Sequence, residues 1–252
     1  MRTFRVVTSQ HRPYYNLIGK DCIESFLKYW PENISIELWA ENFVPDIEDP
    51  RLIVKDWNQI NPRFDEFVAL IESLTDNPKV LSRKKFWMKG HAVLSAMEEC
   101  DSDVFIWLDS DVITHKHIPL DYLDNLIPKN TLSVDIPAGG KAKNREAETG
   151  FFALNLRHKM SQSVIDYYRH CHTTDEILRV NRNLETAVWW NAIMNCERRG
   201  AVTNHLASKV DSLIPFMHTE IAEYMRHWVT PSNKTAYGSG RRDRTEEESI
   251  CK

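Results

Sequence analysis

Short apolar runs alternate with helical patterns along the first 108 residues. The runs with the composition of β-strands are 4–9, 34–39, 52–54 and 104–108. Between them, apolar residues recur at helical spacing over 17–27, 62–74 and 82–100. Strands that alternate with helices in this way predict an α/β fold, in which helices flank a mixed, mainly parallel sheet.

The run from Val104 to Leu108 contains five consecutive apolar residues. An unbroken run is typical of a strand with both faces covered, so we expect a central strand here. Ligands of open α/β sheets collect outside the carboxyl ends of the strands. The residues that follow Leu108 are therefore the first candidates for a ligand site.

The second half of the chain has a less regular pattern. We expect strands at 131–136, 151–156 and 201–206, with a loop at 137–141. Thr173 and Glu176 form a capping-box pattern in front of an expected long helix, 175–199, which Gly200 closes. From residue 232 the composition turns polar, which predicts a single domain over 1–231 and a mobile tail over 232–252.

Composition and charge narrow the classes of function. The formal net charge of the 252 residues is -4, whereas a dedicated nucleic-acid binder is usually basic. No apolar run approaches the ~20 residues that cross a bilayer, and the first seven residues lack the features of a secretory signal, so we expect a cytoplasmic protein without a membrane span. The scattered cysteines contain no CxxC pair and are expected to be free thiols: Cys22, Cys100, Cys171, Cys196 and Cys251.

Asp109-Ser110-Asp111 directly follows the expected central strand. Two carboxylates two residues apart can direct oxygens at one hard divalent cation, and the small Ser110 leaves room for a ligand. The alternative is a polar turn, which we expect for the same tripeptide at the other end of this strand, Asp101-Ser102-Asp103. Its position at the carboxyl end favours a metal site for the first tripeptide.

The segment from Phe105 to Val112 resembles the strand and DxD motif of GT-A glycosyltransferases, including glycogenin-like and phage or bacterial sugar transferases. The resemblance implies a GT-A fold, a nucleotide-diphosphate sugar as donor, with UDP as the expected nucleotide, and Mn²⁺ or Mg²⁺ on Asp109 and Asp111. Ser110 would then contact the donor. The expected halves are a nucleotide-binding part, 1–111, and an acceptor part, 112–231.

Segment 82–89 resembles the basic helix that precedes the DxD strand in this family. Lys85 and Lys89 are four residues apart, hence on one helical face, and can meet the donor's phosphates or sugar. A solvated basic face is the alternative. At the front of the chain, Thr8 and Tyr14 or Tyr15 occupy the turn that holds the nucleotide base in this fold, although packing explains them equally well.

Two later segments offer carboxylates. Segment 148–155 resembles the family's donor-sugar loop, in which Gly150 permits close approach, but Glu148 stands where glycogenin-like members tend to have an amide. Segment 183–191 resembles the helix start that faces the acceptor, and Glu185 there is either an exposed helix residue or a catalytic group. A transferase that inverts configuration needs one carboxylate as base, and Glu148 and Glu185 are the two candidates.

Histidines and tryptophans complete the candidate residues. His218 lies where many GT-A enzymes place a third metal ligand, and a structural role is the alternative. We expect the segments 115–117 and 170–172, each with two histidines, to lie on the surface, because neither contains a zinc set of four ligands. Trp189 and Trp190 either belong to the core or stack on a sugar.

Two other functions remain open at this point. A metal-dependent nucleotidyltransferase or phosphohydrolase also uses carboxylates at strand ends, but it usually needs more acidic ligands and a glycine-rich loop, and 8–15 contains no glycine. A noncatalytic carbohydrate-binding protein on a transferase fold is the second. The acceptor (a glycan, protein, lipid head group or modified nucleobase), the stereochemistry and the oligomeric state stay open, since acceptor pockets are built from variable loops.

Overall fold

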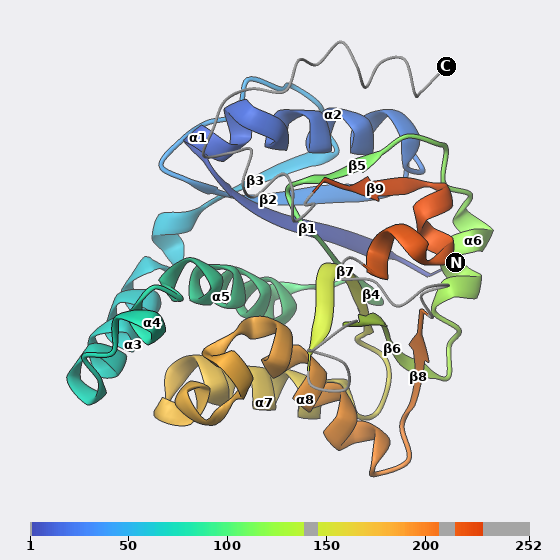
Figure 1. Cartoon of the computed structure of the whole chain (residues 1–252). Helices are drawn as coiled ribbons and strands as arrows, with labels where there is room; N and C mark the ends of the chain where they lie inside the picture. Colours follow the sequence, from blue (N-terminus) through green and yellow to red (C-terminus); the bar gives the residue numbers. More distant parts are fainter. Residues whose placement is uncertain (1, 139–145, 207–214, 229–252) are drawn as a thin grey trace.

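A twisted seven-stranded sheet forms the centre of the chain in the computed structural model, which describes residues 2–138, 146–206 and 215–228 (Figure 1). The strands, in sheet order, are β3 (Leu52–Asp56), β2 (Ser35–Glu41), β1 (Phe4–His11), β4 (Val104–Leu108), β7 (Ala147–Asn155), β6 (Thr131–Pro137) and β8 (Val202–His205). Neighbours are parallel, except that β7 is antiparallel to both β4 and β6. This mixed, mainly parallel sheet confirms the predicted fold class.

Helices cover both faces of the sheet (Figure 1). One face carries α3 (Asn61–Leu74), α5 (Lys84–Glu99), α7 (Ser161–Thr173) and α8 (Glu185–Glu197). The other carries α2 (Lys20–Tyr29) and α6 (Leu120–Leu126). Shorter helical turns are α1 (Arg12–Tyr14), η1 (Tyr15–Gly19), η2 (Trp57–Gln59), α4 (Pro78–Leu81), η6 (Pro215–His218) and η7 (Glu220–Glu223). Within the described ranges, no helix combines the length and apolar character needed to cross a membrane.

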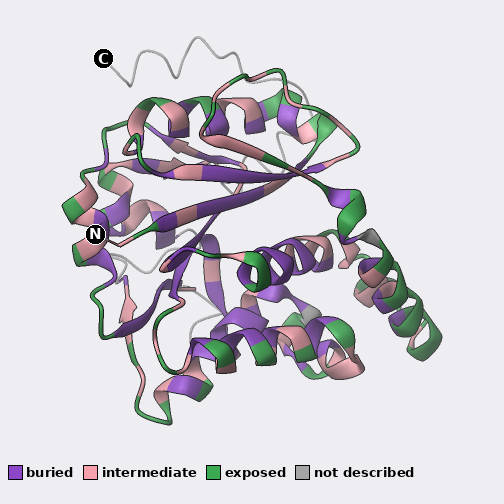
Figure 2. Cartoon of the chain, turned by 180° about the vertical axis from the view of Figure 1, so that it is seen from behind, coloured by how far each residue is buried: buried purple, intermediate pink, exposed green. Residues whose placement is uncertain are grey.

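The apolar run of β4 supplies side chains to both cores. Phe105 and Trp107 pack with the α5, α7 and α8 side, whereas Val104, Ile106 and Leu108 pack with the α2 and α6 side. All five residues are buried, and the buried centre of the sheet is visible in Figure 2. Because successive side chains of a strand point to opposite faces, a strand covered on both sides must be apolar throughout.

A second, two-stranded sheet lies beyond the carboxyl end of β4. Its strands, β5 (Val112–Thr114) and β9 (Met225–His227), are antiparallel. Val112 pairs with His227 and Thr114 with Met225. A segment from the end of the described chain is therefore held next to the residues that follow β4.

The prediction of one long helix over 175–199 is wrong. The chain instead forms two short 3₁₀ turns, η4 (Asp175–Arg179) and η5 (Asn181–Asn183), and then α8. Val180 and Leu184 are extended and buried, and Arg182 has a φ of 56°. Burial of these two apolar side chains outweighs local helix propensity. The capping residue is Thr174, whose side chain accepts from the Glu176 amide, because Thr173 belongs to α7, a helix that the pattern did not predict.

Several expected boundaries shift as strands pair. β1 continues through Gln10 to His11, which pairs with Glu41, so it does not end at residue 9. β7 begins at Ala147, four residues before the expected strand, because it pairs there with Pro137. Gly200 has the expected left-handed backbone, with φ of 89°. Residues 139–141 of the expected loop and the tail 232–252 lie outside the described residues, and the division into two halves stays a prediction.

The described cysteines are free thiols, and the two segments with paired histidines differ in their exposure to solvent. Cys22, Cys100, Cys171 and Cys196 are free, as expected, and Cys251 lies outside the described residues. The 115–117 segment is exposed, as expected. The surface prediction is wrong for Cys171 and His172, which lie on the buried side of α7; only His170 of that segment is exposed.

An ion-pair cluster joins β6, β8 and α8. His205 Nδ1 lies 2.6 Å from Asp135 Oδ1, and His205 Nε2 lies 2.8 Å from Glu197 Oε1. Asp135 is fully buried, and burial raises the pKa of its carboxyl. The hydrogen bond to Asp135 raises the pKa of His205 to about 9, against the opposing effect of burial.

We expect the protein to become less stable as the pH rises through about 9, because His205 then loses the positive charge that pairs with Asp135. The unfolded chain loses the imidazole proton near pH 6.5, whereas the folded chain keeps it, so the stabilisation is complete below pH 6.5 and is lost through the folded pKa. The free energy of unfolding should fall by about 1–2 kcal/mol, a figure that allows for the partial exposure of His205. Urea unfolding at pH 6 and pH 10 should show this loss in the wild type relative to His205→Gln; parallel pH dependences would contradict it.

Candidate active site

Three side chains converge at the carboxyl end of β4. Asp109 and Asp111 follow that strand directly, and β9 brings His227 alongside because it pairs with Val112 of β5. Ligand atoms of the three residues all lie within 4.8 Å of one another. Among the described residues, this is the group of acidic, histidine and cysteine side chains that could hold a metal ion.

His227 is buried between two carboxylates. Its Nε2 lies 3.2 Å from Asp111 Oδ1, and its Nδ1 lies 2.9 Å from Glu148 Oε1. Burial disfavours the imidazolium, but Glu148 and Asp111 outweigh it and raise the pKa of His227 well above its usual range. Within the described chain, neither ring nitrogen makes a hydrogen bond of good geometry. Buried nitrogens without such partners beside two aspartates fit a site for a divalent cation, which would displace a ring proton on binding.

Each aspartate is oriented by neighbouring donors. Trp107 Nε1 donates to Asp109 Oδ1 at 2.7 Å, and the Tyr14 hydroxyl donates to Asp111 Oδ2 at 2.8 Å. Burial raises the pKa of Asp109 despite the cation of Lys89. Burial also opposes the charge on Asp111, yet His227 and Tyr14 outweigh it and lower the pKa of Asp111. The two carboxylates thus differ in how strongly the protein holds their charge.

Lys89 sits on the other side of Asp109. Its Nζ lies 2.6 Å from Asp109 Oδ1 and 3.2 Å from Glu185 Oε1, and it donates to the Thr149 carbonyl and hydroxyl at 3.0 and 2.9 Å. Burial alone would lower the pKa of Lys89, but the two carboxylates outweigh this effect and raise the pKa. The ammonium group of Lys89 therefore keeps its positive charge beside Asp109.

Glu185 is buried at the first residue of α8, so the exposed alternative is wrong. Its Oε1 accepts a 2.9 Å hydrogen bond from the Thr149 hydroxyl and pairs with Lys89. Its Oε2 has no hydrogen-bond partner among the described residues. One carboxylate oxygen is thus committed to Lys89 and Thr149, and the other is not.

Glu148 uses both oxygens within the protein. Oε1 accepts from the Gly150 amide at 3.0 Å, and Oε2 accepts from the Phe216 amide at 3.1 Å. A Cβ at Gly150 would lie 2.7 Å from His227 Nδ1 and 2.8 Å from Glu148 Oε1. The close approach that Gly150 permits in this structure is therefore that of His227 and Glu148.

The other predicted donor residues occupy different positions. Thr8 is buried in β1, and within the described chain its hydroxyl has no partner. Ser110 is half-buried between the two aspartates. Lys85 is exposed, and its Nζ lies 5.1 Å from the centre of the Phe86 ring. Of the two candidate lysines on this helix, Lys85 and Lys89, only Lys89 reaches the convergent carboxylates.

Trp189 and Trp190 belong to the core. Both are buried, and the Trp189 ring packs on Phe152 with centroids 4.1 Å apart. Packing therefore accounts for both rings, and sugar stacking is not their role in this structure.

His227, and not the predicted His218, is the histidine that lies beside the two aspartates. His218 ends η6 and is not one of the three residues whose ligand atoms converge. His227 was missed because it has no local motif. The one signal was the β-favouring composition around it, since Tyr224, Met225, Trp228 and Val229 are apolar or aromatic.

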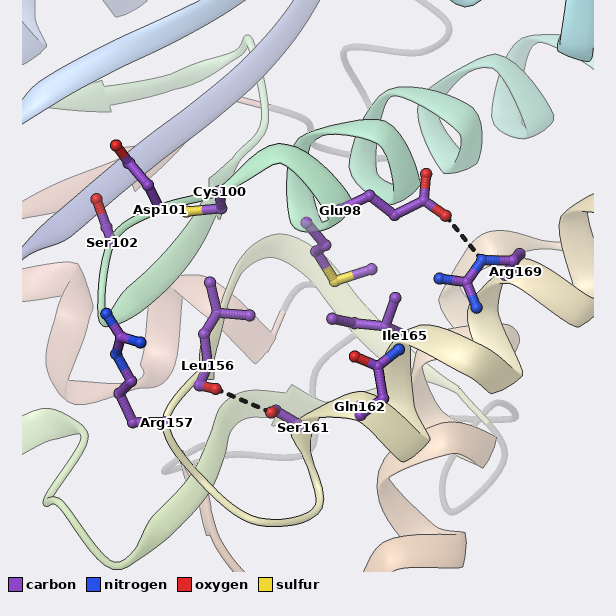
Figure 3. A pocket seen from close by; sticks show the side chains of 11 residues that line it. Glu98, Cys100, Asp101, Ser102, Leu156, Arg157, Ser161, Gln162, Ile165 and Arg169 are labelled. Carbon is purple, nitrogen blue, oxygen red and sulfur yellow. Dashed lines mark hydrogen bonds and ion pairs between the residues drawn. The ribbon is translucent and has the colours of Figure 1, made fainter.

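A hollow of about 540 Å³ lies at the opposite, amino-terminal end of β4 (Figure 3). Arg157 and Arg169 line it, but Arg157 pairs with Asp103 at 2.7 Å and Arg169 pairs with Glu98 at 2.8 Å. Because its cations are already neutralised and it lies away from Asp109, this hollow is not the candidate site.

Comparison with known proteins supports the fold. No protein-family model matches the chain, and no curated protein matches it by sequence. Among solved structures, the apo form of mouse xyloside xylosyltransferase 1 is similar, with a TM-score of 0.50 and 9% sequence identity. The match covers 81% of this chain and 85% of that one. At this identity the similarity shows the fold alone.

We expect His227→Gln to weaken Mn²⁺ binding by about 100-fold or more, because loss of a ligand should cost at least as much as loss of an outer-shell partner, which costs about 10- to 100-fold. His218→Gln is the matched control and should bind Mn²⁺ like the wild type. Titration of free Mn²⁺ by electron paramagnetic resonance measures both affinities. The reverse ranking of the two variants would restore His218 as the third ligand.

Proposed function

We propose that this chain is a metal-dependent glycosyltransferase that moves a sugar from a nucleotide-diphosphate donor, with UDP as the nucleotide, to an acceptor hydroxyl. The observation that carries the proposal is the convergence of Asp109, Asp111 and His227 at the carboxyl end of the central strand, on a fold shared with a xylosyltransferase. In open α/β sheets this edge is where ligands bind.

Mn²⁺ or Mg²⁺, held by these three residues, would supply positive charge for the donor's two phosphates as the nucleotide diphosphate leaves. Tyr14 and Trp107 orient the aspartates by donating to one oxygen of each. Thr8, whose buried hydroxyl in the adjacent strand β1 has no partner among the described residues, and Ser110 are the proposed donor contacts.

Lys89 is the second source of positive charge. It lies 2.6 Å from Asp109 and its pKa is raised, so it would keep a positive charge beside the donor's phosphates. A preorganised charge in a site with little water stabilises developing negative charge more strongly than the same charge in water. Exposed Lys85 has no comparable position.

Glu185 is the carboxylate that we place at the reacting centre. Its Oε2 has no partner among the described residues, whereas both oxygens of Glu148 accept backbone hydrogen bonds. A buried carboxylate beside the donor can accept the acceptor's proton or stabilise positive charge on the sugar.

The small acidic set weighs against nucleotidyl transfer. The convergent group of described residues contains two carboxylates and one imidazole, and the turn after β1 has no glycine before Gly19. Sites for nucleotidyl transfer usually need more acidic ligands and a glycine-rich loop. This composition supports sugar transfer over that alternative.

Asp111→Ala should lower Mn²⁺-dependent transfer or hydrolysis of a UDP-sugar on the order of a thousandfold, because it removes a carboxylate that holds the charge stabilising the leaving group. Asp101→Ala, in the same tripeptide at the other end of β4, is the control and should keep the wild-type rate. The assay is release of UDP from a panel of UDP-sugars, with nucleoside triphosphates in parallel. Full activity of folded Asp111→Ala, or turnover of triphosphates alone, would refute the proposal.

Glu185→Gln should lower the same rate about 100-fold or more, since the amide can neither accept a proton nor offset positive charge. Mn²⁺ affinity should stay within about threefold, because Glu185 is not a ligand. Thermal unfolding checks that the variant folds. A folded variant with the wild-type rate would leave Glu185 only a packing role beside Lys89.

A further inference from the structure

Glu148 is the residue of this site that departs from the family resemblance, and its contacts define what it does. The carboxylate lies at the start of β7, with 14% of its side chain exposed. It accepts one backbone hydrogen bond from its own strand, at Gly150, and one from η6, at Phe216. The group is therefore fixed in place from two segments of the chain.

That fixed carboxylate faces one edge of the His227 ring. Oε1 lies 2.9 Å from Nδ1, while the opposite ring nitrogen, Nε2, lies 3.2 Å from Asp111 Oδ1. An imidazole binds a cation through one nitrogen, and the partner of the other nitrogen fixes the tautomer and the ring orientation. The two contacts of His227 thus assign different tasks to its two nitrogens.

Packing around the pair restricts the ring further. The Phe216 ring lies 5.4 Å from the His227 ring, centroid to centroid. The absence of a side chain at Gly150 leaves the space that His227 Nδ1 and Glu148 Oε1 occupy. His227 cannot turn without breaking the contact to Glu148 or overlapping its neighbours.

We propose that Glu148 is a positioning residue: its Oε1, 2.9 Å from Nδ1, would accept the Nδ1–H of His227 and so leave Nε2 for a metal held with Asp109 and Asp111. The inference rests on the metal site of the proposed function and gives Glu148 a role other than that of catalytic base. It also gives a physical reason for a carboxylate at this position: a charged acceptor holds an imidazole N–H more strongly than an amide oxygen does.

The test measures Mn²⁺ affinity without any sugar donor. Glu148→Ala should weaken binding about 10- to 100-fold, and Glu148→Gln should weaken it by up to about tenfold because the amide oxygen still accepts from Nδ1–H. Glu146→Gln is the matched control: Glu146 is also buried, two residues away, but it pairs with Asn181 and Arg182. That control should keep the wild-type affinity.

Two readouts separate positioning from general support of the fold. Pulsed electron paramagnetic resonance of bound Mn²⁺ should show coupling to an imidazole nitrogen in the wild type, no coupling in His227→Gln, and a changed coupling in Glu148→Ala. A structure of the wild type with Mn²⁺ needs no variant and should place Nε2 on the ion with Nδ1 still beside Glu148.

The outcomes distinguish this inference from the proposed function. Wild-type affinity and coupling in both Glu148 variants, or an ion bound through Nδ1, would overturn the role of Glu148 and leave sugar transfer intact. A wild type that binds Mn²⁺ as described but turns over no sugar nucleotide would overturn the transferase and leave Glu148 as the positioning residue. A wild type that does not bind Mn²⁺ would remove the metal site itself and both conclusions with it.

Discussion

The antiparallel pairing of β5 with β9 is the interaction on which the site depends. β5 begins one residue after Asp111, and its first residue, Val112, pairs with His227. Side chains alternate along a strand, so a slip of one residue would turn His227 to the other face and replace it with Arg226. The burial of Met225 and His227 on either side of half-buried Arg226 fixes the register. Hydrophobic packing thus fixes the register that brings His227 beside Asp111.

Electrostatics then explain why this arrangement favours a cation. Four carboxylates, those of Asp109, Asp111, Glu148 and Glu185, lie around one ammonium group, Lys89, and one imidazole. Burying carboxylates is costly unless positive charge or hydrogen bonds compensate them. The protein compensates Asp109 through Lys89 and Trp107, and Asp111 through Tyr14 and His227. The remaining excess of negative charge is what a divalent ion would offset.

The parts of the molecule that local patterns determine were predicted correctly. The apolar run of β4, the helix before it and the alternation of elements up to Leu108 depend on neighbouring residues, and the sequence shows them directly. His227 was missed because it reaches Asp111 through a pairing between strands more than one hundred residues apart. The prediction of a helix over 175–199 failed because Val180 and Leu184 are buried in an extended conformation, which the local pattern does not reveal. Glu185 was expected at a helix start, but its burial beneath Lys89 depends on α5 and β7 as well.

The two Asp-Ser-Asp tripeptides show how position, and not composition, creates the chemistry. At the amino end of β4, Asp103 accepts from the Thr3 amide and pairs with Arg157, while exposed Asp101 pairs with Arg5. These carboxylates point to separate partners and tie neighbouring segments together. At the carboxyl end of this buried strand, Asp109 and Asp111 have the same spacing, but their carboxylates lie close together. The pairing of β9 with β5 places His227 beside them. The chemistry of this tripeptide therefore depends on the strand that precedes it and on the strand that pairs with the residues after it.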